Sequence, residues 1–308
     1  MKMLSVIVPV YYNEESLPLL MDALERVEAD LRNMCVCLEL IFVDDGSGDN
    51  SLAELMKIKS NRPNTKVVKL TRNFGAIQAI KSGVEYVTGD CFMYLAADLQ
   101  DPPHLIVDMV KRWKRGQRYV ICVREGREDP FFSKCMAAVY YKIIRLLVIK
   151  GFPSGGYDLA LMDKAMLSHI RNSGKNINLS LYGFWLGYKP DIIYYRRRER
   201  VFGASRWTLM KKLKYFSDSV LGFSIAPLRL ISFFGIAVSI LSFFYGAFVI
   251  VDALVNEREV PGFYALAALI AFLLGVVIAM LGVIGEYLWR IFEQTSDRPE
   301  AVVEKVYQ

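Results

Sequence analysis

Residues 38–51 read LELIFVDDGSGDNS, a short apolar run that changes abruptly into a polar cluster. The run has the composition of a buried strand, and the residues after it have helical spacing. The same alternation extends outward along the chain. The predicted strands are 4–10, 38–43, 66–70, 91–96 and 119–123, and the predicted helices are 16–33, 51–59, 76–87 and 103–115. Apolar strands alternating with amphipathic helices predict an α/β fold whose sheet is covered on both faces.

Four of the predicted strands end in polar clusters, which are Tyr11–Glu15, Asp44–Ser47, Arg72–Gly75 and Asp98–Asp101. Ligands bind beyond the carboxyl ends of the strands in such sheets, so we expect these clusters to share one site. No GxGxxG follows the first strand, and GxxxxGK[ST] is absent from the sequence. A Rossmann dehydrogenase or a P-loop ATPase is therefore unsupported.

Two long runs carry no charged residue: 230–251 and 263–285. Each has the roughly 20 residues that a helix needs to cross the hydrocarbon core of a membrane. Two buried core helices are the alternative interpretation, but core helices seldom remain uncharged over this length. The whole chain of 308 residues is 54% hydrophobic, with 38 Lys and Arg against 32 Asp and Glu. This composition excludes a disordered chain.

The charges around the two apolar runs predict the topology. Basic residues flank the pair on its outer sides, namely Lys211, Lys212, Lys214, Arg229 and Arg290. The connecting residues 252–262 carry three acidic residues and one Arg. By the positive-inside rule, the large domain and both termini are cytoplasmic, which places the protein in the cell inner membrane as a multi-pass protein. The five cysteines all lie in the large domain, and their odd number agrees with a reducing compartment.

The predicted division of the chain has four parts: a cytoplasmic α/β domain at 1–207, an amphipathic segment at 208–229, the two spans within 230–285, and a cytoplasmic tail at 286–308. The stretch 208–228 mixes lysines with aromatic and aliphatic residues just before the first span, which favours a helix at the membrane surface. Residues 131–149 have a similar composition. An ordinary packed helix with a solvated basic face is the alternative for both.

Carboxylates and arginines carry the candidate chemistry. Asp98, Gln100 and Asp101 offer hard oxygen ligands suited to Mg²⁺ or Mn²⁺ on a diphosphate, although a capped turn would use the same residues. Residues 194–207 hold five arginines, and 124–127 hold two more. These could clamp phosphates or contact anionic head groups. The modest net charge of +6 gives no broad basic face for nucleic acid.

Six segments together resemble a known family: VIVPVYYNEESLP, VDDGSGDNS, LTRNFGAIQAIKSG, AADLQDPP, SGGYDLALMD and RERVFGASRW, followed by the two spans. In this order they are similar to the GT-A-fold family 2 glycosyltransferases. More closely, they resemble the polyprenyl-phosphate sugar transferases, the group of dolichol-phosphate mannose synthase and bactoprenol glucosyltransferase. The resemblance covers essentially the whole chain. It implies a GT-A domain with juxtamembrane amphipathic helices and a transmembrane hairpin.

The resemblance implies a role for individual residues. The positions that match the nucleotide site are Pro9, Tyr11, Glu14, Asp45, Arg72, Asn73 and Gly75. The family usually reads PxYNEE, whereas Tyr12 and Asn13 stand here where Asn and Glu are expected, so either Asn13 or Glu14 could serve the ribose. Asp98 and Gln100 match metal-binding positions for Mg²⁺ or Mn²⁺. The first Asp of the usual DxDLQ motif is Ala96 in this chain, which favours weaker metal binding over the two alternatives, dependence on arginines in place of a metal and a compromised enzyme.

Asp158 matches the family position of a candidate general base. Since the lipid phosphate that it would activate is already anionic, Asp158 could instead orient the acceptor or the sugar. The positions matching those that hold the acceptor phosphate or donor diphosphate are Arg124, Arg127, Arg197, Arg200 and Ser205. Two anionic partners must approach each other, so positive charge is expected around both.

The resemblance implies an inverting transfer of a sugar from a nucleotide sugar to undecaprenyl phosphate at the membrane, and a UDP-hexose is the expected donor. A homo-oligomer is compatible with the resemblance, and no nucleic acid partner is expected. A processive polysaccharide synthase is disfavoured, because Gly203 stands where QxxRW requires Gln and only two spans follow. The remaining alternative is a non-catalytic membrane scaffold on a decayed transferase domain, which Ala96 alone favours.

Overall fold

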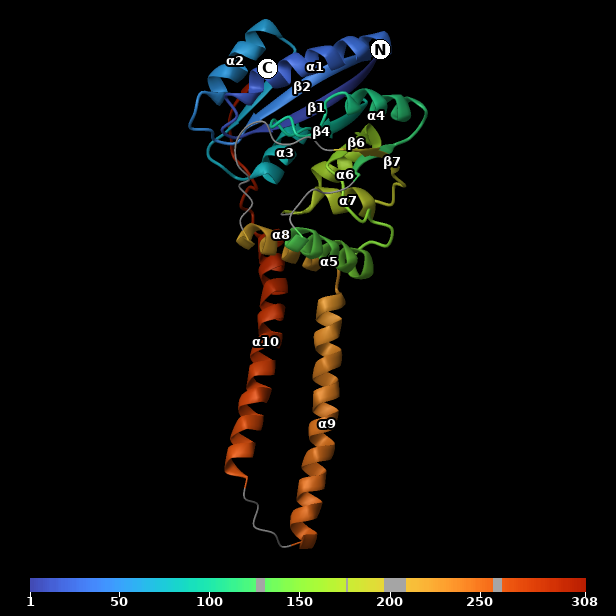
Figure 1. Cartoon of the computed structure of the whole chain (residues 1–308). Helices are drawn as coiled ribbons and strands as arrows, with labels where there is room; N and C mark the ends of the chain where they lie inside the picture. Colours follow the sequence, from blue (N-terminus) through green and yellow to red (C-terminus); the bar gives the residue numbers. More distant parts are fainter. Residues whose placement is uncertain (126–130, 176, 197–208, 257–261) are drawn as a thin grey trace. The chain divides into compact units, whose positions relative to one another are not determined.

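The computed structural model describes residues 1–125, 131–175, 177–196, 209–256 and 262–308. Within these residues, eight strands form one mixed sheet in the order β7-β5-β6-β4-β1-β2-β3-β8 (Figure 1). The strands are β1 Lys2–Val10, β2 Val36–Asp44, β3 Lys66–Leu70, β4 Cys91–Tyr94, β5 Tyr119–Arg124, β6 Leu159–Asp163, β7 Asp191–Tyr195 and β8 Val303–Tyr307. The helices in the same compact part of the chain as this sheet are α1 Ser16–Asn33, α2 Ser51–Asn61, α3 Ala76–Val84, α4 Leu105–Lys114, α5 Phe131–Leu147, α6 Leu167–Arg171, α7 Leu179–Trp185 and α8 Leu209–Leu221.

Both faces of the sheet are buried, as the continuous apolar strands predict. In β2, Leu40 and Phe42 join the core that contains α1, α2 and α4, whereas Ile41 and Val43 join the core that contains α3, α6 and α7. Successive side chains of a strand point to opposite faces, so a strand that is apolar at every position must be covered twice. The predicted α/β architecture is confirmed.

The strand directions bring distant parts of the sequence to one edge of the sheet. β4, β1, β2 and β3 are parallel neighbours, and β5 is parallel to β7. β6 is antiparallel to both β4 and β5, so β5 and β7 run in the direction of β4. The carboxyl ends of these six parallel strands therefore share an edge with the start of β6. That edge collects every predicted polar cluster together with Asp158, which precedes β6.

The structure refines several predicted boundaries. α1 and β3 match their predicted ranges, whereas β4 already ends at Tyr94. The single helix expected at 208–228 is interrupted after Leu221, and the next helix begins at Ala226, whose amide donates to Ser224 Oγ. Ser is a favoured residue at a helix start because its hydroxyl accepts such a bond. Strands β6, β7 and β8 and helices α6 and α7 were not among the predicted elements.

α5 and α8, the two predicted amphipathic helices, pack against each other. The Tyr140 ring contacts the rings of Tyr215 and Phe216, and its hydroxyl donates to Ser219 Oγ at 3.1 Å. Burial raises the pKa of Tyr140 to about 12. On the outside of α5, Met136 and Leu146 are exposed, so the helix has one packed and one uncovered apolar side.

Residues 223–297 form a second compact unit. It contains α9 Ala226–Asn256 and α10 Phe263–Thr295, both long and apolar enough to cross a membrane by length and composition. Within this unit the Tyr287 hydroxyl donates to the Ser224 carbonyl at 2.8 Å. The first unit combines residues 1–222 with 298–308, because the chain returns after α10 to add β8 to the sheet.

Candidate active site

The loop 72–75 is held in place by a carboxylate from the neighbouring strand. Asp45 follows β2 and is 2% exposed. Its two carboxylate oxygens accept the amides of Phe74 at 2.7 Å and Gly75 at 2.9 Å. Burial raises the pKa of Asp45, and these two amides oppose the shift. A carboxylate has about four acceptor positions, so Asp45 can hold the loop and still accept a bond from a ligand.

A glycine allows the ends of β2 and β3 to approach so closely. Gly46 has a φ of +69°, and a Cβ added there would lie 2.6 Å from the Arg72 carbonyl carbon and 2.8 Å from the Asn73 nitrogen. Only a residue without a side chain fits both the left-handed backbone and this contact. The predicted nucleotide residues Arg72, Asn73 and Gly75 thus lie directly against the loop that contains Asp45.

The loop after β1 forms the next part of the edge. Tyr11 is half-buried and its amide donates to Asn13 Oδ1, while one carboxylate oxygen of Glu14 accepts the amide of Asn50. Pro9, the penultimate residue of β1, pairs with Val43 of β2. Both candidates for the ribose contact, Asn13 and Glu14, therefore bond the backbone within this edge of the sheet.

The predicted metal motif follows β4 and contains a strained residue. Asp98 Oδ1 accepts the amide of Gln100 at 3.3 Å, and Leu99 between them has a φ of +58°. In the described part of the chain, the other non-glycine residues with positive φ are Tyr12 and Cys35. Side chains larger than Gly adopt this conformation only when the surroundings enforce it, and such residues cluster at functional sites. Leu99 and Tyr12 both lie at the edge that collects the predicted site residues.

Asp158 is the centre of a charged network. The Arg124 guanidinium donates to both carboxylate oxygens of Asp158 at 2.5 Å each. The Tyr195 hydroxyl lies 2.7 Å from Asp158 Oδ2 and 2.7 Å from Asp101 Oδ1. Asp101 is 5% exposed. These contacts link the ends of β5 and β7, the start of β6 and the loop after β4.

The network shifts the pKa of its members. Burial alone would lower the pKa of Arg124, but the hydrogen bonds and charge of Asp158 outweigh burial and raise it. Burial and the negative charges of Asp158 and Asp101 raise the pKa of Tyr195. The tyrosine therefore stays protonated at neutral pH, and its single proton serves one of the two carboxylates at a time.

The structure brings eleven of the predicted site residues to one edge: Pro9, Tyr11, Glu14, Asp45, Arg72, Asn73, Gly75, Asp98, Gln100, Arg124 and Asp158. The other four, Arg127, Arg197, Arg200 and Ser205, lie outside the described residues. Gly46 and Tyr195 were missed as site residues. The DG pair at 45–46 was a signal for Gly46. Tyr195 had none, because its place depends on the pairing of β7 with β5.

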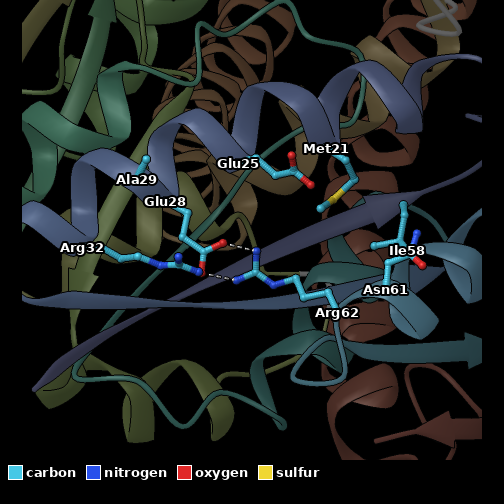
Figure 2. A pocket seen from close by; sticks show the side chains of 8 residues that line it. All are labelled: Met21, Glu25, Glu28, Ala29, Arg32, Ile58, Asn61 and Arg62. Carbon is cyan, nitrogen blue, oxygen red and sulfur yellow. Dashed lines mark hydrogen bonds and ion pairs between the residues drawn. The ribbon is translucent and has the colours of Figure 1, made fainter.

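A cavity of about 400 Å³ lies elsewhere, between α1 and α2 (Figure 2). It is lined by Met21, Glu25, Glu28, Ala29, Arg32, Ile58, Asn61 and Arg62. Arg62 donates to both carboxylate oxygens of Glu28 and to the carbonyl of Leu38, near the start of β2. The cavity is therefore near the end of β2 opposite Asp45, and it contains none of the predicted site residues.

Comparison with known proteins identifies the family. Residues 5–170 match the model of glycosyl transferase family 2. The chain belongs to glycosyl transferase family 2. Glycosyltransferase YkcC of Bacillus subtilis (strain 168) is 35% identical over 98% of this chain and 94% of its own length. Bactoprenol glucosyl transferase of Shigella phage SfII is 30% identical over 99% of this chain and 98% of its own length. The chain is thus an enzyme of the glycosyltransferase class.

Among solved structures, mannosyltransferase PcManGT from Pyrobaculum calidifontis, in complex with GDP-Man and Mn²⁺, is similar to this glycosyltransferase with a TM-score of 0.48. The identity is 16%, and the similarity covers 93% of this chain and 87% of that one. The GT-A fold follows here from the family match and the strand order, with β6 inserted antiparallel between β4 and β5.

Proposed function

We propose that this glycosyltransferase transfers a hexose from a UDP-hexose to a polyprenyl phosphate, with inversion at the anomeric carbon. The observation that carries the proposal is the extent of the match to bactoprenol glucosyl transferase, which includes both apolar helices as well as the sheet domain. Two apolar helices of this length would keep the sheet domain beside a membrane, where a polyprenyl phosphate is located. The name of that relative supports a polyprenyl acceptor and a glucosyl donor for this chain.

The donor nucleotide would lie along the ends of β1, β2 and β3. Asp45 and the loop that it holds, Arg72–Gly75, offer a carboxylate, a guanidinium and an amide beside each other. Arg72 stacks over the Phe74 ring at 4.2 Å, which directs its positive charge along the loop. A base and ribose are recognised by such acceptors and donors, and the diphosphate by positive charge.

The residues after β4 fit a divalent cation of the Mg²⁺ or Mn²⁺ type, but they offer it few protein ligands. Asp98 and Gln100 supply hard oxygens, and in the part of the chain that the structure describes no group of three acidic, His or Cys side chains could hold a metal ion. Mg²⁺ is commonly bound by one or two carboxylates together with substrate phosphates. When bound, the cation would neutralise charge that develops on the departing diphosphate. Ala96 removes one carboxylate from this set.

The acceptor phosphate would enter beside Arg124 and Asp158. A phosphate oxygen of the lipid attacks the anomeric carbon and forms a new carbon–oxygen bond. The bond between that carbon and the β-phosphate oxygen breaks, and the nucleoside diphosphate leaves with the electron pair. Because the attacking phosphate is already anionic, no proton has to be removed. The fork between Arg124 and Asp158 supports an orienting role for Asp158 in place of a free general base.

We place the sheet domain and both ends of the chain on the cytoplasmic side of the inner membrane, with α9 and α10 spanning it. The distribution of basic residues around the two helices supports this orientation. α5 and α8, with their uncovered apolar side chains, would lie at the membrane surface, where the phosphate of the acceptor is located.

The test is turnover by the purified full-length protein in detergent. It is incubated with undecaprenyl phosphate, Mg²⁺ or Mn²⁺, and a panel of UDP-, GDP- and dTDP-sugars, and the lipid fraction is analysed by mass spectrometry. We expect a monosaccharide-phospho-polyprenyl product with a UDP-hexose. A product from another nucleotide sugar would correct the donor alone. Nucleotide binding without any glycolipid from folded protein would contradict the proposal and favour a scaffold.

A further inference from the structure

The last strand of the chain reaches the loop that the proposed donor site uses. β8 pairs with β3 in antiparallel register, with Val68 opposite Val306 and Leu70 opposite Val303. The pairing continues beyond β3, because the Thr71 amide donates to the Val302 carbonyl at 3.0 Å. Thr71 is the residue immediately before Arg72. The final hydrogen bond of this ladder therefore fixes the point where the 72–75 loop begins.

A second contact holds the residues that follow the loop. α3 begins at Ala76, directly after Gly75, and carries Lys81. Lys81 Nζ lies 2.6 and 2.8 Å from the two carboxylate oxygens of Glu300, and it also donates to the carbonyls of Ser173 and Gly174. The Lys81 side chain is 10% exposed and that of Glu300 is 23% exposed. A shielded pair of this kind is screened less by salt than a surface pair.

Apolar packing joins these two polar contacts. Ala301, Val303 and Val306 pack on the core that contains Ile80 and Leu70. A strand added to a sheet edge forms main-chain hydrogen bonds along the edge, and every second side chain packs into a pocket. Residues 300–307 are thus bound along their length, from the Lys81–Glu300 pair to the last residue of β8.

We propose that residues 300–307 position the 72–75 loop for nucleotide binding, and that Glu300 is the positioning residue that acts through Lys81 and α3. Asp45 accepts the amides of Phe74 and Gly75 within the loop, whereas Val302 holds Thr71 before the loop and Glu300 holds Lys81 after it. Loss of the Glu300 contact releases one end of the loop and leaves Asp45 in place. The choice of a nucleotide as the ligand rests on the proposed function, whereas the restraint on the loop rests only on the contacts described above.

The experiment compares Glu300→Gln with Glu304→Gln in the full-length protein in detergent. Glu304 pairs with Lys69 at 2.8 Å within the β3–β8 ladder and makes no contact with α3 that the structure records, so its variant is the matched control. UDP, GDP and dTDP are titrated by calorimetry, and the nucleotide that the unaltered protein binds is used for both variants. We expect Glu300→Gln to weaken binding about 3- to 10-fold, and Glu304→Gln to change it less than 2-fold.

Hydrogen exchange provides a readout that needs no nucleotide. We expect amide exchange at Phe74 and Gly75 to be faster in Glu300→Gln, with β8 still protected and the melting temperature within a few degrees. The double variant Lys81→Gln/Glu300→Gln should behave like Lys81→Gln alone, since loss of Lys81 already removes the Glu300 contact together with the bonds to Ser173 and Gly174. Equal exchange of the loop in both Glu variants, or equal nucleotide affinity, would overturn the inference. If the loop is restrained as proposed but the protein binds a nucleotide other than UDP, only the proposed donor has to be corrected.

Discussion

Arg124 donates to both carboxylate oxygens of Asp158, so the residue at the position of a candidate base is tied to a cation by two parallel hydrogen bonds. Their side chains are 19% and 17% exposed, so most of the pair is shielded from solvent. Arginine makes such a fork with a fixed direction, and lysine does not. The orientation of Asp158 therefore depends on the shape of the Arg124 guanidinium as well as on its charge.

We expect Arg124→Lys to reduce kcat by about 10²-fold, because small losses of alignment cost this much in catalysis. Steady-state turnover of the full-length protein measures the effect. Arg112→Lys is the matched control, since Arg112 pairs with Asp191 at 2.6 Å, at the opposite end of β7 from Tyr195. Equal activity of both variants would show that charge alone is sufficient at position 124.

Tyr195→Phe removes the hydroxyl that lies between Asp101 and Asp158. We expect the variant to lose about 1–3 kcal/mol of stability, because a buried carboxylate loses its donor. Turnover should fall as well. Tyr182→Phe is the control, since the Tyr182 hydroxyl donates to the carbonyl of His169 instead. Thermal unfolding and turnover measured side by side check the prediction, and a Tyr195→Phe protein as stable and active as the control would contradict it.

We expect the stimulation of turnover by a metal ion to depend on the residues after β4. Asp98→Asn should abolish most of the stimulation by Mg²⁺ or Mn²⁺, whereas Asp108→Asn, on the exposed side of α4, should leave it intact. Ala96→Asp should lower the metal concentration that gives half of the maximal rate, because it adds an oxygen ligand. Metal titrations of turnover test both. Unchanged stimulation in Asp98→Asn would mean that this carboxylate only caps its turn.

Gly46→Ala tests the contact between the ends of β2 and β3. The positive φ alone costs about 1–3 kcal/mol for a residue with a side chain. Gly187→Ala is the control, because Gly187 has a φ of +83° but nothing within 4 Å of an added Cβ. We expect both variants to lose stability and only Gly46→Ala to raise the KM for the nucleotide sugar. An equal KM in both would remove Gly46 from the donor site.

The pH dependence of stability should report on Glu39, at the other end of the sheet. Burial alone would raise the pKa of Glu39, but hydrogen bonds from Lys66, Ser5 and Thr88 outweigh it and lower the pKa. A lowered folded pKa adds stability above the unfolded value of about 4.3, and that stability is lost as the pH falls through the folded pKa. The raised pKa values of Asp44 and Asp45 act in the opposite direction.

We therefore expect Glu39→Gln to cost about 3 kcal/mol at pH 7, because it leaves Lys66 without its buried partner. The difference in stability between the unaltered protein and this variant should shrink as the pH is lowered below 4 to 5. Unfolding of both proteins at several pH values isolates the Glu39 contribution from that of the other acids. A difference that is constant with pH would assign the stabilisation to packing.

Local pattern accounts for the part of the fold that was predicted. The helix at 16–33 has apolar residues at helical spacing, and its buried face contains Leu17, Leu20 and Leu24 as that spacing requires. β3 is a short apolar run with polar neighbours. The predicted site residues at the strand ends came from the same logic, since parallel strands bring their carboxyl ends together wherever they lie in the sequence.

Long-range pairing accounts for what was missed. β8 reads VEKVY, in which two adjacent charged residues interrupt the apolar pattern, and Lys69, the ion-pair partner of Glu304, is 235 residues away in the sequence. Tyr195 lies in a run that reads as the start of a basic tract, and only the pairing of β7 with β5 places its hydroxyl between two carboxylates. Propensity and periodicity contain no information about such partners.

The pairing of β8 with β3 also has a consequence for biosynthesis. Translation adds about 5–20 residues per second, so β3 has left the ribosome on the order of ten seconds or more before β8 is made. Throughout that interval the nascent sheet has an open edge, of the kind that pairs with other chains. The edge closes only after both apolar helices have been synthesised. Addition of β8 to the sheet therefore follows synthesis of the segment proposed to enter the membrane.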